Sequence, residues 1–396
     1  MSTMRADLVV VGAGLAGSAA AWAASARGMH VVVLEAFGPG HRNGSSHGSA
    51  RIFRRAYPDP LYVRLTGQAG ELWRQLEAEA GESLLHLTGG LDFGALRDPA
   101  NLHAVLTECG VPAELIDPAE AAERWPQFDF AGVGPVMVHA EAGVLDPDRA
   151  MAAMLRLAAG RGADVRFSTP VTRLATAPGA DVRFAAPVTR LAAAPGGDGA
   201  VAHTDSGTFA APVVVVTAGP WLPELAGDLI PLPPLTVTQQ QVFHFAPRQP
   251  PAHPWPIFIC QDQTTHFYGL PGGRDGVVPG AIKLGEHTPG TVTTATGRDF
   301  AVDPAARARA IAFVNKRLPG LDSPPVNEVT CLYTSTATED FLLDRHGPFV
   351  VASACSGHGA KFAPLLGQII AALAAGEPPP APRFTLAAHQ ISPSAT

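Results

Sequence analysis

A short apolar strand that runs directly into a glycine-rich turn opens the chain and constrains its fold more than any other feature. Residues 7–11 read DLVVV, the pattern of a strand buried on both faces. The turn at 12–17 reads GAGLAG, and an alanine-rich segment at 18–27 and a second apolar run at 30–34 follow it. This order predicts a βαβ unit with the GxGxxG pattern in its first turn, which is typical of dinucleotide-binding folds.

Four residues of this unit have distinct physical roles in such a site. Gly12 permits the tight turn, Gly14 lets the backbone approach a pyrophosphate, and Gly17 lets the helix pack closely on the strand. The helix N-terminus offers unpaired N–H groups and partial positive charge to the phosphates. Glu35, at the end of the second strand, is positioned to accept hydrogen bonds from ribose hydroxyls. The pattern alone leaves FAD and NAD open, but its N-terminal position in a chain with no second GxGxxG favours one tightly held FAD.

The composition indicates a globular protein and argues against several classes. The 396 residues are 46% apolar and 16% charged, and at about 100–200 residues per domain this length predicts two domains. The formal net charge of −7 argues against a nucleic-acid binder. Cys109, Cys260, Cys331 and Cys355 show no zinc-type spacing, so we expect no metal site, no disulfide framework and a cytoplasmic location. The apolar run at 365–375 is too short to cross a bilayer, so we expect no membrane association.

Apolar spacing and turn signals predict further helices and strands. Asp98, Asp117 and Asp146 each precede a proline, and this pair of residues is a helix-start signal because the carboxylate caps the first free N–H groups. Two valine-containing runs, 213–216 and 349–352, predict buried strands that end in glycine-containing turns. The expected helices cover residues 61–80, 99–109, 118–124, 147–161, 304–317 and 364–375.

Dinucleotide-type strands near both ends of the chain, with a β-rich segment between them, predict two discontinuous domains. The expected fold class is α/β, a Rossmann-like FAD-binding domain with an inserted β-rich α+β substrate domain. The expected boundaries give residues 1–85, 145–228 and 328–390 to the FAD-binding domain, 86–144 and 229–327 to the substrate domain, and 391–396 to a tail.

A tandem duplication lies within the expected FAD-binding domain. The segment 162–178 recurs at 179–195 with a period of 17 residues, and only three pairs of positions differ. Two copies of one strand and loop are too few for a solenoid. We therefore expect one copy to keep the ancestral place and the other to be a surface insertion, which loops tolerate at low cost.

Four segments taken together resemble one family, the sarcosine oxidase and N-methyl-amino-acid oxidase group of D-amino-acid-oxidase-like flavoproteins. They are GAGLAGS with VVVLE near the N-terminus, SSHGSARIFR at 45–54, AIKLGEH at 281–287, and CLY at 331–333 followed by SGHGAKF at 356–362. These segments span nearly the whole chain in the family's order. The resemblance implies a cofactor, a reaction and specific site residues.

Cys331 is the position at which the resemblance is most specific. The family attaches FAD through a thioether from such a cysteine to the 8α-methyl carbon of the flavin, so the resemblance implies a covalent 8α-S-cysteinyl bond at Cys331. Taken alone, a free cysteine is more often a small buried apolar residue. Cys109, Cys260 and Cys355 keep that interpretation, although Cys355 is expected to lie near the flavin.

The resemblance also implies which residues bind substrate and activate oxygen. Arg54 and Lys361 match the pair that grips the substrate carboxylate, and Tyr268 matches a tyrosine of the substrate pocket. Lys283 matches the lysine that activates O₂, where a fixed ammonium stabilises the developing anion, and its apolar neighbours predict that it points inward. His287 matches the family's active-site histidine.

The remaining implied flavin contacts lie mostly in glycine-containing loops. Arg51 matches the arginine that lies against the flavin ring, where positive charge favours the anionic reduced form. The duplication leaves Val171 and Val188 as candidates for the valine that contacts the flavin, and the usual distance to Gly219 favours Val188. The other implied contacts are Ser45, Ser46, His47, Gly219, Trp221, Gly357, His358, Gly359 and Lys361.

The implied reaction is the oxidation of a secondary amino acid such as sarcosine by O₂, which gives the demethylated amine, an aldehyde and H₂O₂. We expect a monomer with no partner chain. Ala360 and Glu286 stand where relatives carry aromatic residues, so the pocket wall is expected to differ, and a cyclic imino acid or a larger secondary-metabolite amine stays open as the substrate. A flavin dehydrogenase with another electron acceptor and a non-catalytic flavoprotein are further alternatives, and Lys283 argues against the dehydrogenase.

Overall fold

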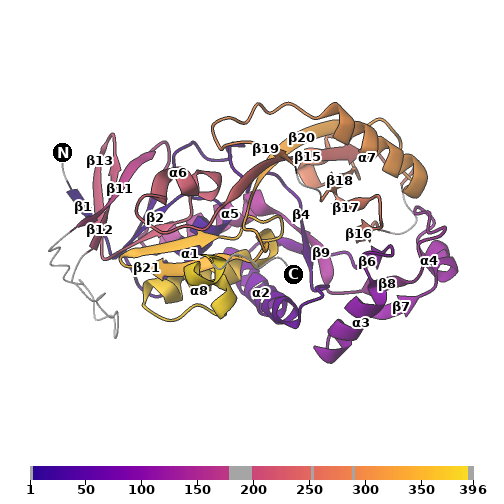
Figure 1. Cartoon of the computed structure of the whole chain (residues 1–396), viewed down its shortest axis with the longest axis horizontal. Helices are drawn as coiled ribbons and strands as arrows, with labels where there is room; N and C mark the ends of the chain where they lie inside the picture. The colour runs from indigo at the N-terminus through magenta and orange to yellow at the C-terminus, as the bar shows by residue number, and fades with distance from the viewer. Residues whose placement is uncertain (1–2, 178–198, 251–253, 288–289, 391–396) are drawn as a thin grey trace.

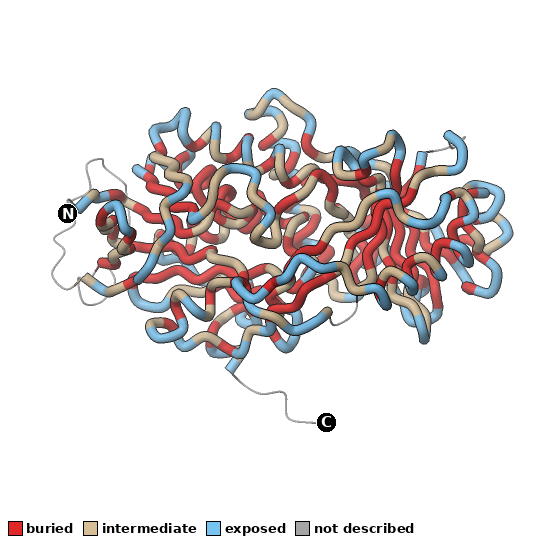
Figure 2. Tube along the Cα trace, turned by 90° about the horizontal axis from the view of Figure 1, so that it is seen from above, coloured by how far each residue is buried: buried red, intermediate tan, exposed pale blue. Residues whose placement is uncertain are grey.

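The elements of the chain form two lobes that lie side by side along the long axis of the molecule (Figure 1). The computed structural model describes residues 3–177, 199–250, 254–287 and 290–390. Buried chain runs through the strands of both lobes, and exposed residues lie mostly on the outer loops (Figure 2).

A six-stranded sheet forms the centre of the first lobe and contains the predicted βαβ unit. Five neighbouring strands are parallel, and the edge strand β21 runs antiparallel to β22. The strands β2, β3 and β14 are buried along their whole length, as strands covered on both faces are expected to be. The predicted α/β fold class is therefore confirmed. The order across the sheet is β10 (Asp164–Arg166), β3 (Val31–Leu34), β2 (Leu8–Val11), β14 (Val213–Val216), β22 (Phe349–Ser353) and β21 (Leu342–His346).

Small residues let the helices of this lobe approach one another closely. Helix α1 (Leu15–Ala26) follows the glycine turn and packs against α8 (Ala363–Ala374) and α5 (Pro147–Gly160). A Cβ added at Gly367 of α8 would lie 2.3 Å from the carbonyl oxygen of Ala19, so only glycine fits at that contact. The remaining helices of this lobe are α2 (Pro60–Ala80), α6 (Leu222–Ala226) and α9 (Leu386–Gln390).

The three predicted Asp-Pro helix starts are confirmed. The side chain of Asp98 accepts a hydrogen bond from the N–H of Asn101 at the start of α3 (Pro99–Glu108). Asp117 caps α4 (Pro118–Arg124) and Asp146 caps α5 in the same way. Each cap satisfies N–H groups that a helix leaves unpaired, and each adjacent proline lacks the N–H that would need a partner.

A nine-stranded sheet forms the second lobe, with aromatic residues such as Phe93, Phe258 and Phe313 packed against it. Helix α7 (Pro304–Arg317) packs on this sheet through Phe313, whose ring stacks on Phe267 at a centroid distance of 4.4 Å. The strands are β6 (Gly90–Phe93), β7 (Glu114–Ile116), β8 (Val136–His139), β15 (Thr236–Phe245), β16 (Ile257–Gln261), β17 (His266–Pro271), β18 (Ile282–Glu286), β19 (Thr291–Val292) and β20 (Asn327–Ser335).

Strand β20 differs from the expected division at residue 328. It pairs with β15 in register from Thr236 opposite Ser335 to His244 opposite Asn327, so it is a strand of the second lobe. The chain returns to the six-stranded sheet only at β21. The two-domain division stays a proposal, and this pairing favours a boundary after Ser335.

A four-stranded sheet extends the first lobe and contains the second strand of the first copy of the duplicated segment, whose first strand is β10 of the six-stranded sheet. Val171, in this copy, begins β11, which pairs with β12. The second copy, residues 179–195, lies outside the described residues, and so does Val188. The order of the strands is β1 (Thr3–Arg5), β13 (Gly207–Ala211), β12 (Gly199–Thr204) and β11 (Val171–Ala177).

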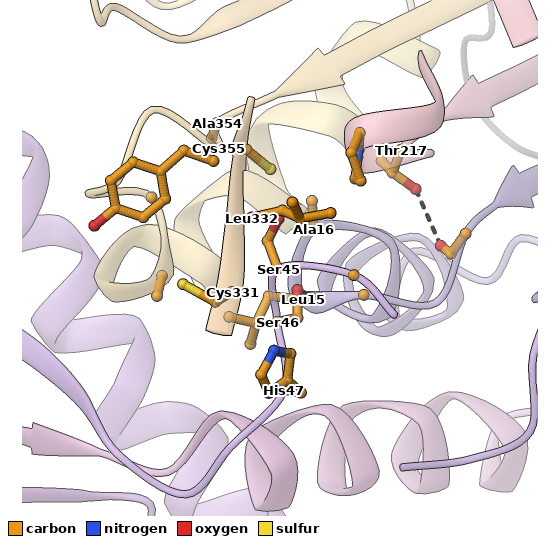
Figure 3. Close-up of a pocket in the computed structure, with 18 of the residues that line it drawn as sticks. Leu15, Ala16, Ser45, Ser46, His47, Thr217, Cys331, Leu332, Ala354 and Cys355 are labelled. Carbon is orange, nitrogen blue, oxygen red and sulfur yellow. Dashed lines mark hydrogen bonds between the residues drawn. The ribbon is translucent and has the colours of Figure 1, made fainter. Parts of the chain in front are cut away.

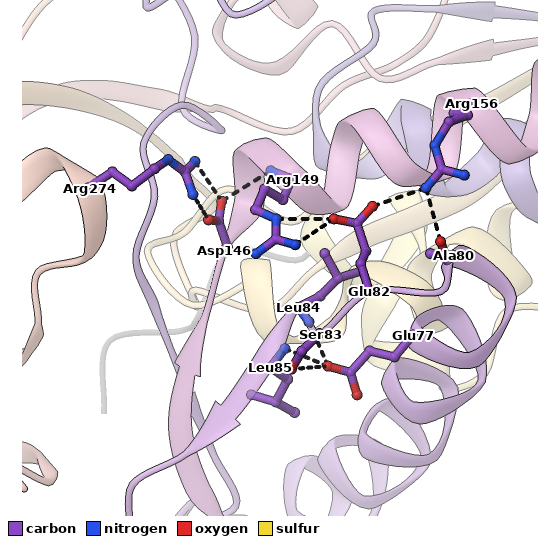
Figure 4. A network of polar contacts seen from close by, with 10 residues as sticks. All are labelled: Glu77, Ala80, Glu82, Ser83, Leu84, Leu85, Asp146, Arg149, Arg156 and Arg274. Carbon is purple, nitrogen blue, oxygen red and sulfur yellow. Dashed lines mark hydrogen bonds and ion pairs between the residues drawn. The ribbon is translucent and has the colours of Figure 1, made fainter.

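Short strands and ion pairs connect the two lobes. Strands β4 (Arg51–Arg54), β9 (Ala142–Leu145) and β5 (Leu85–Leu87) form a small antiparallel sheet. Close to it, Arg274 of the second lobe forms an ion pair with Asp146 at the start of α5 (Figure 4). This contact orders the segment after β17 against the first lobe.

Glu82 holds the other end of this polar network together. Its carboxylate accepts hydrogen bonds from Arg149 at 2.7 Å and from Arg156 at 3.0 Å, and both arginines lie on α5 (Figure 4). Isolated surface pairs contribute little stability, but a connected network fixes the loop after α2 against α5.

Within the described ranges, no helix is long and apolar enough to cross a membrane. The same residues contain no cluster of three or more His, Cys, Asp or Glu side chains that could hold a metal ion. All four cysteines are free thiols.

Candidate active site

A large cavity of about 1150 Å³ is lined by residues of both lobes. It is larger than the roughly 300–1,000 Å³ of a typical small-molecule pocket. It brings together every sequence-predicted site residue within the described ranges except Gly17. The predicted residues that line it are Gly12, Gly14, Glu35, Ser45, Ser46, His47, Arg51, Arg54, Gly219, Trp221, Tyr268, Lys283, His287, Cys331, Gly357, His358, Gly359 and Lys361.

The glycine turn is held against the end of β14. Gly12 has a φ of +95°, which favours glycine, and a Cβ added there would lie 2.7 Å from the carbonyl oxygen of Thr217. The Thr217 hydroxyl donates hydrogen bonds to the carbonyl oxygens of Val11 at 2.9 Å and Gly12 at 3.0 Å. Figure 3 shows Thr217 among the residues that line the cavity. A Cβ added at Gly17 would lie 1.8 Å from the Gly12 carbonyl oxygen, so Gly17 acts through packing.

Glu35 is anchored as an ionised acceptor at the edge of this turn. Its carboxylate accepts hydrogen bonds from the N–H of Ala13 at 2.7 Å and of Phe37 at 3.0 Å. His41 lies 3.3 Å away. Burial opposes ionisation, but these contacts outweigh it and lower the pKa of Glu35. No sequence motif marks His41 beyond its place in a glycine-containing loop.

The N-terminus of α1 meets the loop at 44–52. The Ser46 hydroxyl accepts a hydrogen bond from the N–H of Leu15 at 3.1 Å, and a Cβ added at Gly14 would lie 3.0 Å from the same oxygen. The neighbouring Ser45 hydroxyl is buried without a hydrogen-bond partner among the described residues. Figure 3 shows Ser45, Ser46 and Leu15 in this part of the cavity. Such an arrangement suits a phosphate ligand.

The Arg51 side chain stabilises the same loop through hydrogen bonds to its backbone. It donates hydrogen bonds to the carbonyl oxygens of Ser45 at 3.1 Å and His47 at 2.7 Å. Burial, followed by the positive charges of Arg51, Arg298 and Lys283, lowers the pKa of His47 to about 3, so its ring is neutral. The Nε2 atom of His47 is buried and has no partner in the described structure.

Cys331 lies on β20 and is buried in the cavity wall, opposite Gln240 of β15 in register. Figure 3 shows Cys331 and Cys355 among the side chains that line the cavity. Burial raises the pKa of the Cys355 thiol to about 11, which keeps it protonated. Tyr333 also lines the cavity, and the alternation of a strand could have identified it, because it is two residues beyond Cys331.

Lys283 is buried, as its apolar neighbours predict, with 5% of its surface exposed. Its ammonium donates a hydrogen bond to the carbonyl oxygen of Ala50 at 2.9 Å. Burial and then the nearby Arg51 lower the pKa of Lys283 to about 7. Its charge is therefore sensitive to whatever anion enters the cavity.

Arg54 and Lys361 meet around the ring of Tyr57. Lys361 donates hydrogen bonds to the Tyr57 hydroxyl at 3.1 Å and to the carbonyl oxygen of His358 at 2.8 Å. The guanidinium carbon of Arg54 lies 4.3 Å from the centre of the Tyr57 ring. Burial lowers the pKa of both cations. One guanidinium nitrogen of Arg54, Nη1, is buried with no partner among the described residues, so this end lacks an anion.

His287 and Tyr268 line the cavity beside two residues that sequence reasoning missed. His266 is two residues before Tyr268 on β17, so strand alternation predicts that both face the same side. Its ring contacts that of His287 at a centroid distance of 4.8 Å, and burial followed by His287 lowers the pKa of His266 to about 4. Glu339 lies 3.7 Å from His287.

Of the two expected departures in the pocket wall, only Ala360 lines the cavity. The expectation for Glu286 is wrong. Its carboxylate lies 2.8 Å from the guanidinium of Arg309 on α7. Because side chains alternate along β18, Lys283 points into the cavity and Glu286, three residues later, points away.

The residues present fit an FAD molecule. The glycine turn, the α1 N-terminus and Glu35 suit a dinucleotide, and the buried, unpartnered atoms of Ser45 and His47 lie in the same cavity. Val171 lines this cavity, and the other valine candidate, Val188, lies outside the described residues. Arg54, Lys361 and Lys283 line the same cavity.

Known proteins with similar sequences support the same assignment. Residues 7–373 match the family described as DAO, FAD dependent oxidoreductase. The chain is 34% identical over 383 residues to monomeric sarcosine oxidase from Streptomyces avermitilis, covering 93% of each protein. It is 31% identical over 387 residues to N-methyl-L-tryptophan oxidase from Yersinia pestis, covering 94% of this chain and 96% of the relative.

Solved structures agree with the fold. The chain superimposes with a TM-score of 0.79 and 27% identity on the open form of NikD, an unusual amino acid oxidase essential for nikkomycin biosynthesis, covering 95% and 98% of the two chains. It superimposes on L-proline dehydrogenase from P. horikoshii with a TM-score of 0.81 at 21% identity, covering 97% and 98%. With the glycine turn, the cavity and the family match in agreement, this chain belongs to the DAO family of FAD-dependent oxidoreductases and is an enzyme of the sarcosine oxidase type that acts on CH–NH donors.

Proposed function

We propose that this enzyme oxidises a secondary N-methyl amino acid with O₂ and releases the demethylated amine, an aldehyde and H₂O₂. The observation that carries the proposal is that Arg54, Lys361 and Lys283 line the same cavity as the glycine turn at 12–17. The similarity to a monomeric sarcosine oxidase and to an N-methyl-L-tryptophan oxidase, each above 30% identity, supports this substrate class.

Arg54 and Lys361 bind the substrate carboxylate. Arg54 lines the cavity, and its planar guanidinium can form two parallel hydrogen bonds with a carboxylate. Lys361 is held by Tyr57 and His358, which leaves its third proton for the same carboxylate. Both cations are largely removed from water, so the anion gains more from them than it would at the surface.

Bound FAD supplies the acceptor for the hydride that leaves the carbon attached to the amine nitrogen. The amine must lose its ammonium proton before that carbon can give up a hydride. His287, which lies beside Glu339, can accept this proton. The proton can then pass to solvent by way of Glu339, whose side chain is 59% exposed. In sum, substrate, O₂ and water give the demethylated amine, the aldehyde and H₂O₂.

Lys283 serves the oxygen step. Its ammonium lies inside the cavity and is fixed by the Ala50 carbonyl, so it can stabilise negative charge that develops on O₂ without reorganisation. The buried thiol of Cys331 in the same wall supports a covalent link to the flavin. We further propose that the enzyme is a monomer and that it is cytoplasmic; the four free thiols support the reducing compartment.

A larger or cyclic amine remains a second candidate substrate, because Ala360 lines the cavity where relatives carry an aromatic residue. An anaerobic screen tests both classes. Sarcosine, other N-methyl amino acids and cyclic imino acids are mixed with the holoenzyme, and bleaching of the flavin is recorded. Bleaching by cyclic imino acids alone would exclude the N-methyl class.

Admission of air to the bleached enzyme tests the electron acceptor. Rapid return of the yellow colour with one H₂O₂ per flavin is expected for an oxidase. Slow return that only an artificial acceptor accelerates would identify a dehydrogenase instead.

A further inference from the structure

A third cation, Arg97, lines the cavity with Arg54 and Lys361. It follows β6, and its backbone N–H donates hydrogen bonds to the carbonyl oxygens of Gly94 at 3.0 Å and Gln261 at 3.1 Å. The side chain is largely buried, with 10% of its surface exposed. An arginine in this setting is costly unless something pairs with it.

Asp92 pairs with Arg97 and fixes its orientation. Its Oδ1 atom accepts a hydrogen bond from Arg97 Nε at 2.5 Å, and its Oδ2 atom lies 3.1 Å from His139 Nε2. Asp92 is completely buried. Burial opposes its ionisation, but Arg97 and His139 outweigh it and lower the pKa of Asp92, so the carboxylate is charged.

The outer nitrogens of Arg97 are not used by Asp92. Nη2 donates a hydrogen bond to the carbonyl oxygen of Ala56 at 3.2 Å. Nη1 makes no hydrogen bond with the described residues, and Arg97 lines the cavity with 10% of its side chain exposed. The guanidinium therefore keeps an unused donor while Asp92 holds its Nε.

The charges at this end of the cavity do not balance. Arg54 and Arg97 are cations, and Asp92 is the one fully buried carboxylate that pairs with either of them in the described structure. Lys361 is a third cation when it is protonated, and burial followed by Arg54 lowers its pKa, so a nearby anion favours its charged form. Glu339 lies at the wall with 59% of its side chain exposed and pairs with His287. With Lys361 protonated, a ligand with one carboxylate leaves one excess buried positive charge, which is unfavourable in a low-dielectric site.

Arg54 and Arg97 also lie close enough to affect one another. The charge of Arg97 contributes to the lowered pKa of Arg54, after burial. Both charges also contribute to the lowered pKa of His266, after burial and His287. His266 is therefore a neutral hydrogen-bonding group between cations, and a second anion near them would relieve their mutual repulsion.

We infer that Arg97 binds a second carboxylate of the substrate, and that the enzyme prefers a secondary amine with two carboxylates, such as an N-methyl aminodicarboxylic acid. This inference rests on the proposed function, because it assigns the substrate class of the same cavity. Arg54 and Lys361 hold the carboxylate next to the amine, and Arg97 holds the side-chain carboxylate.

The test compares each acid with its amide, which has nearly the same shape without the charge. N-methylaspartate is paired with N-methylasparagine, and N-methylglutamate with N-methylglutamine, both enantiomers of each, with the holoenzyme. We expect kcat/KM to be at least about tenfold higher for one acid than for its amide. Equal values for every pair would overturn the inference, while oxidation of the amides would leave the proposed function intact.

Substitutions of Arg97 test whether this residue causes the preference for the acid over its amide. In Arg97→Met the acid should lose its advantage, chiefly through a higher KM, while the amide should change by no more than about threefold. Arg97→Lys should retain part of the advantage. The matched control is Arg55→Met, because Arg55 pairs with Glu141 and lines a separate cavity, and its ratio of acid to amide should equal that of the wild type. Equal losses for acid and amide in Arg97→Met would show a purely structural role.

Removal of Arg97 alone leaves Asp92 buried without its cation, so the variant could fail to fold. The double variant Asp92→Asn/Arg97→Gln removes both charges together and should show the same loss of preference. Binding of succinate and of succinamate to the wild-type holoenzyme, followed by flavin absorbance, gives a measurement without any variant. Equal affinity for these two ligands would contradict the inference. If no amine bleaches the flavin at all, the proposed function and the inference both fail.

Discussion

The ammonium nitrogen of Lys283 lies 2.9 Å from the carbonyl oxygen of Ala50. Lys283 belongs to β18 of the second lobe, and Ala50 to the loop between β3 and β4. The same hydrogen bond therefore fixes the lysine and joins the two halves of the cavity.

Lys283→Met should slow the reaction of the reduced enzyme with O₂ by about 100-fold or more, because it removes a fixed positive charge from the oxygen site. Anaerobic reduction by substrate should change little. Stopped-flow measurement of the two half-reactions separates them. A normal oxygen rate in this variant would eliminate the proposed role of Lys283.

The oxygen reaction should also depend on pH. Because burial and Arg51 lower the pKa of Lys283 to about 7, the ammonium is present below that value and lost above it. The rate constant for O₂ should fall as the pH rises through this region, at a value moved upward by any bound anion. In Lys283→Met, the rate constant for O₂ should not depend on pH between pH 6 and about 9. If this variant showed the same pH dependence as the wild type, the titrating group would not be Lys283.

Cys331→Ser should abolish covalent attachment of the flavin while the cavity keeps its shape, because only the sulfur is replaced. Acid precipitation should leave all the yellow colour with the wild-type protein and release it from the variant. Cys355→Ser is the matched control, since Cys355 lines the same cavity and its thiol is kept protonated. Colour released from the wild type would refute the bond at Cys331.

Arg54→Met should weaken binding of a simple carboxylate such as propionate by about 10–100-fold, since hydrogen bonds to charged groups are worth about 1.5–3 kcal/mol. Tyr57→Phe removes one neutral partner of Lys361 and should weaken binding by about 2–10-fold. Perturbation of the flavin spectrum measures both affinities. If Tyr57→Phe weakened carboxylate binding more than Arg54→Met, Arg54 would not be the main carboxylate-binding residue.

Gly17→Ala should destabilise the protein by at least about 3 kcal/mol and reduce FAD retention, because the new Cβ would meet the backbone carbonyl oxygen of Gly12 at 1.8 Å. Gly160→Ala is the matched control. Gly160 ends α5, and a Cβ there would have nothing within 4 Å, so stability should change by less than about 1 kcal/mol. Thermal melts of both variants provide the comparison, and equal melting temperatures would exclude the packing role of Gly17.

Local signals predicted the parts of the fold that depend on neighbouring residues. The βαβ unit, the Asp-Pro helix starts and the inward position of Lys283 follow from patterns a few residues long. The pairing of β20 with β15 depends on strands nearly a hundred residues apart, and nothing local to Asn327 indicates it.

The parts of the site that the sequence did not predict also depend mostly on contacts between residues that are far apart in the chain. Tyr57 and Arg97 act through partners such as Lys361 and Asp92 that the fold brings together. The family resemblance implies that Glu286 lies in the pocket wall, but the alternation of β18 turns it towards Arg309. His266 is the exception, because the period of its strand could have identified it beside Tyr268.

The place of Cys331 on β20 has a mechanical consequence. Phosphates bound at the N-terminus of α1 belong to the first lobe, whereas β20 is paired along its length with β15 of the second. A flavin bonded to Cys331 would therefore cross-link the lobes through its own skeleton. Opening of one lobe would strain the other, so the flavinylated enzyme should unfold in a single cooperative transition at a higher temperature than the apoprotein.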